Sequence, residues 1–259
     1  PGLPCFMRCL YTEVINGSSN ELRKKLATTM SYFSNSQNPT VSASDAEVLT
    51  AQMVDIIAIQ NLYGAASGGV TAGNTTYGAG GSLGNYLDYL FDAMLTGTTN
   101  SGYAGDDVAL TIFDESGTDT LDVSVDTTNQ IISLLGGTFS SIAGLSENLG
   151  IAVGTVIENA NTGSGNDTII TNSANNEINA GAGNDTIEAG SGGTDSINGG
   201  AGTDTLDVSF DFSDVTDGSV SGTVATLIGS FGTIETDLVE SFVFTDQTMS
   251  FAELEANMA

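Results

Sequence analysis

The sequence contains no histidine and no tryptophan, and it has four lysine and arginine residues against 32 aspartate and glutamate residues. All four basic side chains lie before residue 26, so the rest of the chain cannot neutralise phosphate groups, which excludes nucleic acid as a partner. The formal net charge of −28 opposes a compact fold by self-repulsion. External cations are therefore expected to neutralise part of this negative charge. Another part can be explained as an ordinary acidic surface exposed to solvent.

Long apolar runs and cysteines are also scarce. No stretch approaches the roughly 18 consecutive apolar residues of a transmembrane helix, so no membrane span is expected. Cys5 and Cys9 make a poor zinc site without a histidine, and free thiols, a short-loop disulfide or pairing with another chain all remain open. The 33 glycines, three prolines and 40% apolar residues predict an ordered chain with many tight turns.

The N-terminal part, residues 1–62, differs from the rest because it holds every basic residue and both cysteines. Residues 20–29 predict a short helix. A longer helix is expected to start at Ser44, whose spacing to Glu47 makes a capping box, and to end near Gly64.

The chain beyond residue 64 changes character. Residues 65–82 are rich in glycine, alanine, serine and threonine and predict a loop, and residues 83–95 predict a short helical or irregular stretch. From Asp106 onward the helical period disappears, and short β-branched runs alternate with glycine and Asx turns. This pattern predicts a mainly β structure.

Glycine-rich repeats settle the predicted fold class. In each unit a turn leads to an aspartate or asparagine, and an aliphatic residue follows two positions later. The glycines allow tight turns and close backbone approach, while alternation along a strand directs the aliphatic residue into the core. The units are one outlying copy, Asp114–Asp122, and five contiguous ones, Thr162–Ile170, Thr171–Asn179, Ala180–Glu188, Ala189–Asn198 and Gly199–Asp207.

Two such units make a coil of about 18 residues, so alternate units stack in a parallel β-roll, a calcium-binding nonapeptide solenoid. Asp167, Asp185 and Asp204 are expected along one edge, and Asn176 and Asp195 along the other. Carboxylates stacked about 4.8 Å apart repel one another unless a hard cation lies between them. Calcium accepts six to eight oxygen ligands, whereas magnesium prefers a tighter octahedron and keeps its waters.

The repeats therefore predict several calcium ions. A single such turn would be an ordinary glycine turn, but five contiguous units with the same aliphatic offset exclude chance. The site between Asn176 and Asp195 is expected to be weakest or empty, because Asn176 lacks a carboxylate and its unit lacks glycines. The predicted ligands in the repeats are Gly163, Gly165, Asp167, Gly181, Gly183, Asp185, Gly192, Asp195, Gly200, Gly202 and Asp204.

A family resemblance rests on four separated features that occur in the family's order. They are Asp55–Gly64 (DIIAIQNLYG), Asp114–Ser124, Thr155–Gly165 (TVIENANTGSG) and the repeats. Together they resemble the C-terminal part of serralysins, secreted zinc endopeptidases of the metzincin clan that carry a calcium-loaded β-roll behind the catalytic domain.

The resemblance covers roughly residues 26–207 and implies two domains. Residues 1–64 would be the C-terminal portion of a metzincin-like catalytic domain, a small helical remnant with the Met-turn and the final helix. Residues 65–259 would be the calcium-binding β-roll with a C-terminal β cap.

The resemblance also implies roles for single residues. Met30 would be the Met-turn residue beneath a catalytic zinc, and Tyr32 would ligate the zinc or support the oxyanion. Read without the family, both are ordinary core residues.

Two further calcium sites follow from the same likeness. Gly73 and Thr75 lie in a loop that resembles a calcium-binding loop of the family, and with Asp114 and Asp119 they would bind one ion. Thr71 and Asn74 stand in this loop where the family usually has an arginine and an aspartate. The ligands of the second ion would be Gly117, Asp119 and Glu158.

The sequence departs from the family at the zinc motif, H-E-x-x-H-x-x-G-x-x-H, which is absent. The family often places Pro-Gly after its third histidine, and the sequence begins Pro1-Gly2, so it is expected to start one residue after that motif. Zinc is therefore expected only if the motif lies upstream, and this polypeptide alone is expected to be inactive. Glu240–Asp246 (ESFVFTD) resembles the closing segment of secreted repeat-in-toxin proteins, which implies type I export to the extracellular space.

Two functions remain open. The first is the calcium-binding C-terminal region of a secreted serralysin-like metalloendopeptidase, with protein substrates as partners. The second is an extracellular, calcium-dependent structural repeat protein that self-assembles through its open ends and edges and has no protease activity. Zinc content and casein cleavage would favour the first, and large particles formed in calcium would favour the second.

Overall fold

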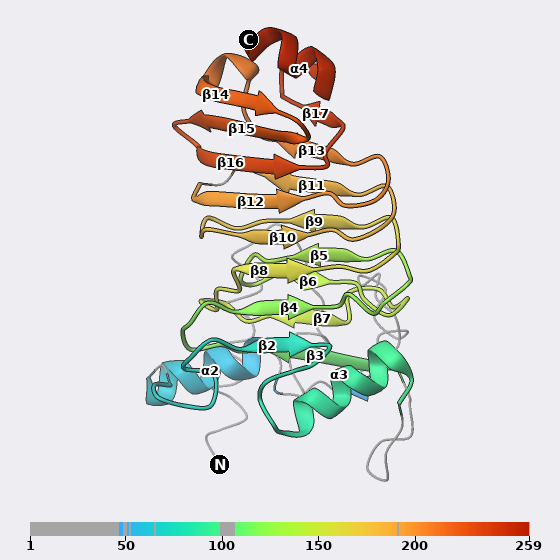
Figure 1. Cartoon of the computed structure of the whole chain (residues 1–259). Coiled ribbons are helices and arrows are strands. Elements are labelled where there is room, and N and C mark those ends of the chain that lie inside the picture. The colour runs from blue at the N-terminus through green and yellow to red at the C-terminus, as the bar shows by residue number, and fades with distance from the viewer. Residues whose placement is uncertain are drawn as a thin grey trace, which may run out of the picture.

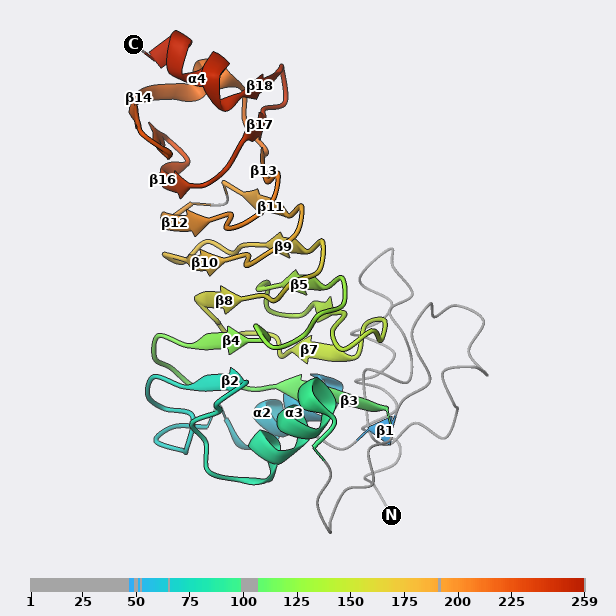
Figure 2. The same ribbon diagram turned by 45° about the vertical axis from the view of Figure 1, so that its right-hand side comes forward.

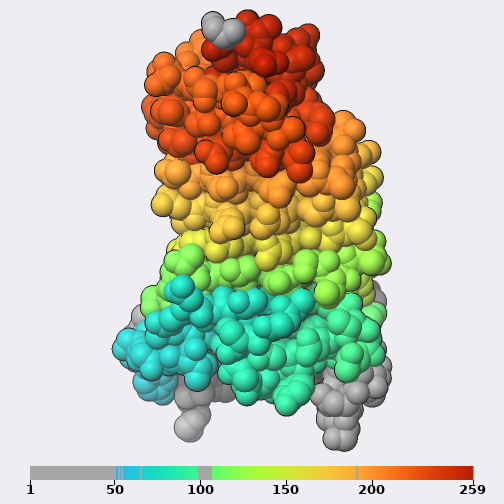
Figure 3. Space-filling model, in the orientation of Figure 1, coloured from blue at the N-terminus to red at the C-terminus, as the bar shows by residue number. Residues whose placement is uncertain are grey.

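The computed structural model describes residues 47–48, 51, 53–64, 66–98, 107–190 and 192–258. The predictions for Met30, Tyr32, Cys5, Cys9 and the helix at residues 20–29 lie outside these residues. Most of the described chain winds into a stack of coils (Figure 1). Successive bands of colour in the space-filling view show that each part of the sequence stacks on the part before it (Figure 3).

Two sheets of short strands face each other across the stack, as Figure 2 shows, and a smaller third sheet lies near its N-terminal end. The eight-stranded sheet runs in the order β14 (Val215–Ser221), β15 (Val224–Gly229), β16 (Gly232–Asp237), β12 (Thr194–Asn198), β10 (Glu177–Asn179), β8 (Asn159–Asn161), β4 (Thr120–Asp122) and β2 (Thr76–Gly78). The six-stranded sheet runs β18 (Thr248–Ser250), β17 (Ser241–Val243), β13 (Thr205–Val208), β11 (Thr186–Ala189), β9 (Thr168–Ile170) and β5 (Ile131–Ser133). The four-stranded sheet runs β1 (Glu47–Val48), β3 (Val108–Ile112), β7 (Leu149–Ile151) and β6 (Phe139–Ser140).

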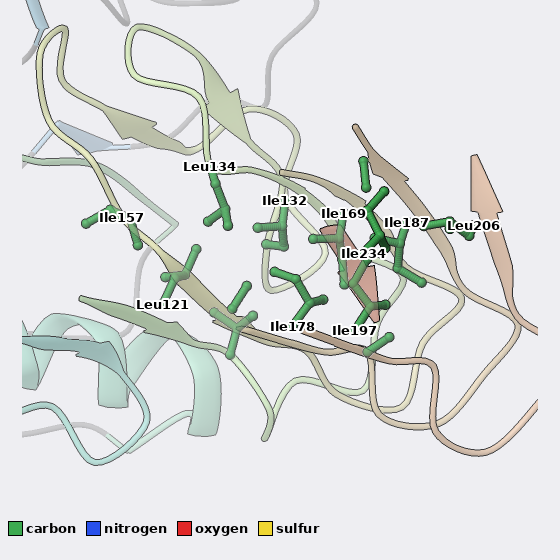
Figure 4. Close-up of a cluster of buried hydrophobic side chains, with 14 of the residues drawn as sticks. Leu121, Ile132, Leu134, Ile157, Ile169, Ile178, Ile187, Ile197, Leu206 and Ile234 are labelled. Atoms are coloured by element: carbon green, nitrogen blue, oxygen red, sulfur yellow. The ribbon is translucent and has the colours of Figure 1, made fainter. Parts of the chain in front are cut away.

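The core of the roll is a column of aliphatic side chains between the two large sheets (Figure 4). Parallel pairing keeps these side chains in register, so Ile187 of β11 lies opposite Ile169 of β9 and Leu206 of β13. All three are fully buried. Burying an isoleucine or leucine stabilises a fold by about 1.5–3 kcal/mol. The constant offset between acidic and aliphatic residues therefore places each carboxylate at the edge and each aliphatic residue in the core, and the predicted mainly β, parallel β-roll class is confirmed.

The C-terminal end of the roll is covered by antiparallel structure. Strands β14, β15 and β16 form a meander, β17 and β18 form a hairpin, and the short 3-10 helix η2 (Phe212–Asp214) precedes the meander. The rings of Phe210 and Phe231 stack with their centroids 3.7 Å apart. Such a cap protects the last coil of the solenoid from pairing with other chains.

A C-terminal helix, α4 (Phe251–Met258), completes this cap and buries Leu254. The expectation that helices end before Asp106 was therefore wrong here. The helix starts with a capping arrangement, because the backbone N–H of Ser250 donates to Glu253 Oε2 at 2.8 Å and the N–H of Glu253 donates back to Ser250 Oγ at 3.4 Å. This Ser-x-x-Glu spacing was the sequence signal that could have identified it.

The N-terminal region also differs from the sequence prediction. Glu47–Val48 forms strand β1, which pairs in parallel with β3, and the helix α2 starts only at Met53 and ends at Tyr63. The expected capping box at Ser44 and Glu47 is therefore wrong, since sheet hydrogen bonds to β3 decide the backbone at Glu47 in place of the local helical preference.

Residues 65–82 contain strand β2, where a loop was expected. Its central residue, Tyr77, is fully buried and extends the core by one strand. The predicted stretch at 83–95 is the helix α3 (Tyr86–Thr96), which Asn85 caps by accepting a hydrogen bond from the Leu87 N–H. Among the described residues, no helix is long and apolar enough to cross a membrane.

Candidate metal sites at the edges of the roll

The turns of the roll form two columns, one along each edge. We call the column containing Asp167, Asp185 and Asp204 the Asp185 edge, and the column containing Asp119, Glu158, Asn176 and Asp195 the Asp195 edge. Asp195 is the second residue of β12, and each of the other residues directly precedes its strand. Within each sheet these strands lie side by side in register. The structure thus brings together the acidic residues that the repeat pattern assigned to each edge.

Along the Asp185 edge each carboxylate reaches the backbone of the preceding coil. Asp185 Oδ1 accepts a hydrogen bond from the Asp167 N–H at 2.8 Å, and Asp204 Oδ1 accepts one from the Asp185 N–H at 2.8 Å. Because of these bonds, each carboxylate lies between two successive turns. In each carboxylate, Oδ1 accepts this hydrogen bond and Oδ2 does not take part in it.

The second carboxylate oxygen has no hydrogen-bond donor. The Oδ2 atoms of Asp167, Asp185, Asp195 and Asp204 are buried and accept no hydrogen bond within the described structure. Leaving a buried acceptor unpaired costs about 1–3 kcal/mol, and more when it is charged. No basic side chain exists after residue 25 to supply the donor. A bound cation would remove this cost.

Burial also changes how these groups ionise. Burial raises the pKa of Asp185 to about 6, and the negative charges of Asp167 and Asp204 raise it as well, while the hydrogen bond from the Asp167 N–H lowers it. Burial likewise raises the pKa of Asp195 to about 6. The folded turns thus disfavour the charged carboxylates that they contain, and a divalent cation would reverse this preference.

Backbone carbonyl groups provide further oxygens at these turns. Gly163 O accepts a hydrogen bond from the Ala182 N–H at 2.9 Å, and a carbonyl oxygen has a second lone pair. A Cβ atom at Gly183 would collide with Gly165 O, which shows how closely the carbonyls of one turn approach the next. Among the described residues, no three histidine, cysteine, aspartate or glutamate side chains form a metal site by themselves. Carbonyl oxygens would therefore supply much of the ligand set, as calcium prefers.

The sites implied by the family resemblance are assembled on the first coils. The Thr75 N–H donates to Asp119 Oδ1 at 2.7 Å, and the Asp119 N–H donates to Glu158 Oε2 at 2.7 Å. A Cβ at Gly117 would lie 2.6 Å from Gly73 O, so the two loops touch. The structure thus gathers the residues assigned to the second ion and those assigned to the first, since Asp114 also interacts with Asp119.

Asp114, the fourth residue of the first ion, binds a partner that the sequence did not identify. The hydroxyl of the buried Tyr77 donates to Asp114 Oδ2 at 2.6 Å, while Asp114 Oδ1 is buried and unpartnered. Burial and the adjacent Asp114 raise the pKa of Tyr77, so this phenol stays protonated and donates. One Asp114 oxygen thus remains for a cation.

The Asp195 edge is interrupted at the unit without glycines. Asn176 Nδ2 donates to Glu158 O at 2.7 Å and to Asn172 Oδ1 at 3.0 Å, and Asn172 Nδ2 donates to Ile157 O at 2.7 Å. Amide N–H groups therefore satisfy carbonyl oxygens that could otherwise face a cation. Between Asn176 and Asp195 the carboxylate ligation is reduced to Asp195, whose Oδ1 accepts from the Asn176 N–H at 3.0 Å.

Glu240 continues the Asp185 edge and was missed as a site residue. Its Oε2 accepts a hydrogen bond from the Asp204 N–H at 2.7 Å, the same bond that each earlier carboxylate makes. The sequence signal was present, because Phe242 follows Glu240 by two positions as Leu206 follows Asp204. The missing glycines before Glu240 obscured it.

The stacked coils, the aliphatic column and the glycine turns define the chain as a parallel β-roll. The family model described as Peptidase M10 serralysin C terminal matches residues 94–251. The chain therefore belongs to the serralysin C-terminal domain family.

Individual relatives agree with this assignment. Metallopeptidase AprA of Pseudomonas marginalis is 41% identical over 150 residues, which cover 57% of this chain and 29% of the relative. Serralysin G of Dickeya chrysanthemi is 43% identical over 122 residues, covering 47% of this chain and 23% of the relative. Metalloprotease AprA of Pseudomonas entomophila is 35% identical over 178 residues, covering 68% of this chain and 32% of the relative. The chain thus spans no more than about a third of these proteins.

Proposed function

We propose that the chain is the calcium-binding C-terminal region of a secreted, serralysin-like metalloendopeptidase. The observation that carries the proposal is the set of buried, donor-less carboxylate oxygens on Asp167, Asp185, Asp195 and Asp204. Calcium ions between successive turns would pair these oxygens with turn carbonyls. Folding and ion binding would then be coupled, because the ligands come together only when the coils stack.

The peptidase activity itself would belong to a longer protein. By the family likeness, Met30 and Tyr32 would adjoin a catalytic zinc that upstream histidines hold, and the zinc would activate a water for attack on a peptide carbonyl. The sequence here has no histidine, so this polypeptide alone is expected to cleave no casein and to bind no stoichiometric zinc. Type I export and an extracellular location are part of the same proposal, with protein substrates and calcium as partners.

The alternative is an extracellular structural protein that self-assembles. The observation that favours it is strand β14, which ends the eight-stranded sheet and pairs within that sheet with β15 alone. An open strand edge is a template for another chain. Light scattering in calcium separates the two functions, since the first predicts single chains and the second predicts large particles.

A matched pair of variants tests the calcium sites. Asp185→Asn removes a buried carboxylate from the Asp185 edge, and Glu188→Gln removes one charge from an exposed residue of the same unit. The Asp185 variant should bind calcium at least about tenfold more weakly at its site and need more calcium to fold, because ligand charge sets calcium affinity. Glu188→Gln should titrate like the parent chain in calorimetry. Equal calcium affinities for the two variants would refute the assigned ligand.

A further inference from the structure

A segment that precedes the repeats has the hydrogen bonds of a repeat turn. Residues 126–133 (DTTNQIIS) contain no glycine, and 28 residues separate them from the first contiguous unit at Thr162. Nevertheless the Gln130 N–H donates a hydrogen bond to Asp167 Oδ1 at 2.8 Å. This bond is equivalent to the one that the Asp167 N–H donates to Asp185 Oδ1 in the next coil. Gln130 therefore occupies the next position on the Asp185 edge.

Three more bonds repeat in the same way. The Thr168 N–H donates to Gln130 O at 2.9 Å, and the Asn166 N–H donates to Asn129 Oδ1 at 2.9 Å. The Ser164 N–H donates to Asp126 O at 3.2 Å, which matches the bond between the next two turns of the edge. Strand β5 then pairs with β9 in the same register that joins the repeats. Residues 126–130, which we call the leading turn, thus stack on the first repeat as the repeats stack on one another.

The glycines of the first repeat make room for the leading turn. A Cβ atom at Gly163 would collide with Asp126 O, and a Cβ at Gly165 would collide with Thr128 O. Neither glycine has a positive φ, so close approach, and not turn conformation, requires the missing side chain. Asp126 O and Thr128 O of the leading turn therefore lie against the glycines of the first repeat. In the same way, Gly163 O and Gly165 O lie against the glycines of the next turn along the edge.

The two residues that meet at this junction, Gln130 and Asp167, each have a buried side-chain oxygen without a donor. Asp167 is 2% exposed and its Oδ1 touches the leading turn, while its Oδ2 accepts no hydrogen bond. Gln130 is 1% exposed and its Nε2 donates to Val123 O at 3.3 Å, just before the leading turn, while its Oε1 accepts no hydrogen bond. The Asp126 carboxylate is also buried and adds a second negative charge near Asp167.

We propose that a calcium ion binds between the leading turn and the first repeat, at the start of the Asp185 edge. Its ligands would be Asp126 O, Thr128 O, Gln130 Oε1 and Asp167 Oδ2, completed by water. All four atoms are hard oxygen donors, and the two nearby carboxylates balance the charge of one divalent ion. The inference rests on the proposed calcium binding of the roll, and it adds a site that the glycine pattern cannot reveal.

Such an ion would stabilise the leading turn against the first repeat. Strand β5 is the outermost strand of the six-stranded sheet, so its turn has no further repeat to stack on. At the position of the edge aspartates the leading turn has Gln130, so without an ion the Asp167 Oδ2 atom would stay unpaired beside the charge of Asp126. The ion would fasten residues 126–133 to the repeats and thereby fix where the roll begins.

The direct test is a crystal structure of the chain grown in calcium, with the ions located by anomalous scattering. The expected result is an ion within ligand distance, about 2.3–2.6 Å, of Asp126 O and Asp167 Oδ2. Occupied sites between the Asp167 and Asp185 turns without an ion at the leading turn would overturn this inference alone. A structure with no calcium at any turn would instead overturn the proposed function.

Calcium affinity provides the second measurement. Gln130→Met removes the amide oxygen at similar length and should weaken one site by about tenfold, whereas Gln130→Asp adds a charge and should strengthen one site by about tenfold. Thr127→Ala, at an exposed position in the same turn, is the control and should leave every site unchanged. Because the Asp variant is a gain of binding, a folding defect in the Met variant cannot hide the result. Unchanged affinity in both would contradict the site.

Discussion

At the scale of the residue, each aspartate of an edge divides its carboxylate between two tasks. One oxygen accepts a backbone N–H from the preceding coil, as Asp185 Oδ1 does from Asp167, and the other has no donor. The first bond sets the stacking of the coils, and the second oxygen requires a cation. This division explains why asparagine, which offers one oxygen and two N–H groups, can keep the stacking of coils and still remove a charge from the site.

Asn176 shows this exchange and can be reversed. At limiting calcium, Asn176→Asp should destabilise the fold by about 1–3 kcal/mol, because Glu158 O and Asn172 Oδ1 lose their donor and a charge is buried. In saturating calcium the same variant should bind one additional ion. Denaturant unfolding and calcium counting would measure both effects.

The control for this exchange is Asn175→Asp, since Asn175 is exposed and makes its bond to the Thr194 N–H through an oxygen that aspartate retains. The same added charge should there change neither the stability at limiting calcium nor the ion count. An Asn176 variant that behaves like the Asn175 variant would contradict the role of the amide.

The pH dependence of the calcium-free chain follows from the raised pKa values. Burial raises the pKa of Asp119, Asp185 and Asp195 to about 6, above the ordinary aspartate value near 3.9. A raised pKa in the folded state favours the protonated form. These groups therefore stabilise the metal-free fold below about pH 4, and that stability is lost as the pH rises through about 6.

Calcium reverses the direction, because it binds the ionised carboxylates. Calcium affinity should fall as the pH drops below about 6, while the β structure that the chain keeps in chelator, measured by circular dichroism, should be greater at pH 4 than at pH 7. A metal-free chain whose β structure increases between pH 4 and pH 7 would contradict the assignment of these buried carboxylates.

At the scale of the element, each strand is too short to be stable alone and depends on its inward-facing residue. Strand β5 offers a matched comparison, since Ile132 is fully buried and its neighbour Ile131 is 50% exposed. Ile132→Ala should cost about 2–5 kcal/mol in saturating calcium, whereas Ile131→Ala should cost less than about 1 kcal/mol. Denaturant unfolding of both variants would measure the difference, and equal costs would contradict the described core.

The elements also show what the sequence could predict. The acidic-to-aliphatic offset was sufficient for strands β9 to β13, because one local pattern there specifies both the turn and the inward residue. It missed the turn before β5, where stacking supplies the geometry and Gln130 replaces the aspartate. It also missed β1, whose backbone pairs with a strand about 60 residues later in the chain, since no local pattern reports such a partner.

Site residues followed the same rule. The aspartates of the glycine-rich units could be assigned because glycine, acid and aliphatic residue recur at fixed spacing. Tyr77 and Asn172 could not, since each contacts the edges through the packing of separate coils. Their roles depend on which segments lie side by side, and that is a property of the assembled roll.

At the scale of the whole molecule, the chain has a net charge of −28 and stacks many of its acidic groups along two edges. Parallel stacking alone supplies hydrogen bonds and an aliphatic column, yet it also concentrates negative charge that no basic residue of the roll offsets. Calcium would turn this repulsion into cross-links between coils. The roll should accordingly fold as a unit when the ions bind, and not coil by coil in their absence.

The most direct test of this coupling is far-ultraviolet circular dichroism of the chain in excess chelator and in millimolar calcium, with bound metal counted by elemental analysis in both. The account predicts a largely unfolded chain without metal, and β structure with several bound calcium ions once calcium is added. A metal-free chain with the same β spectrum and the same thermal midpoint as the calcium-treated sample would contradict it.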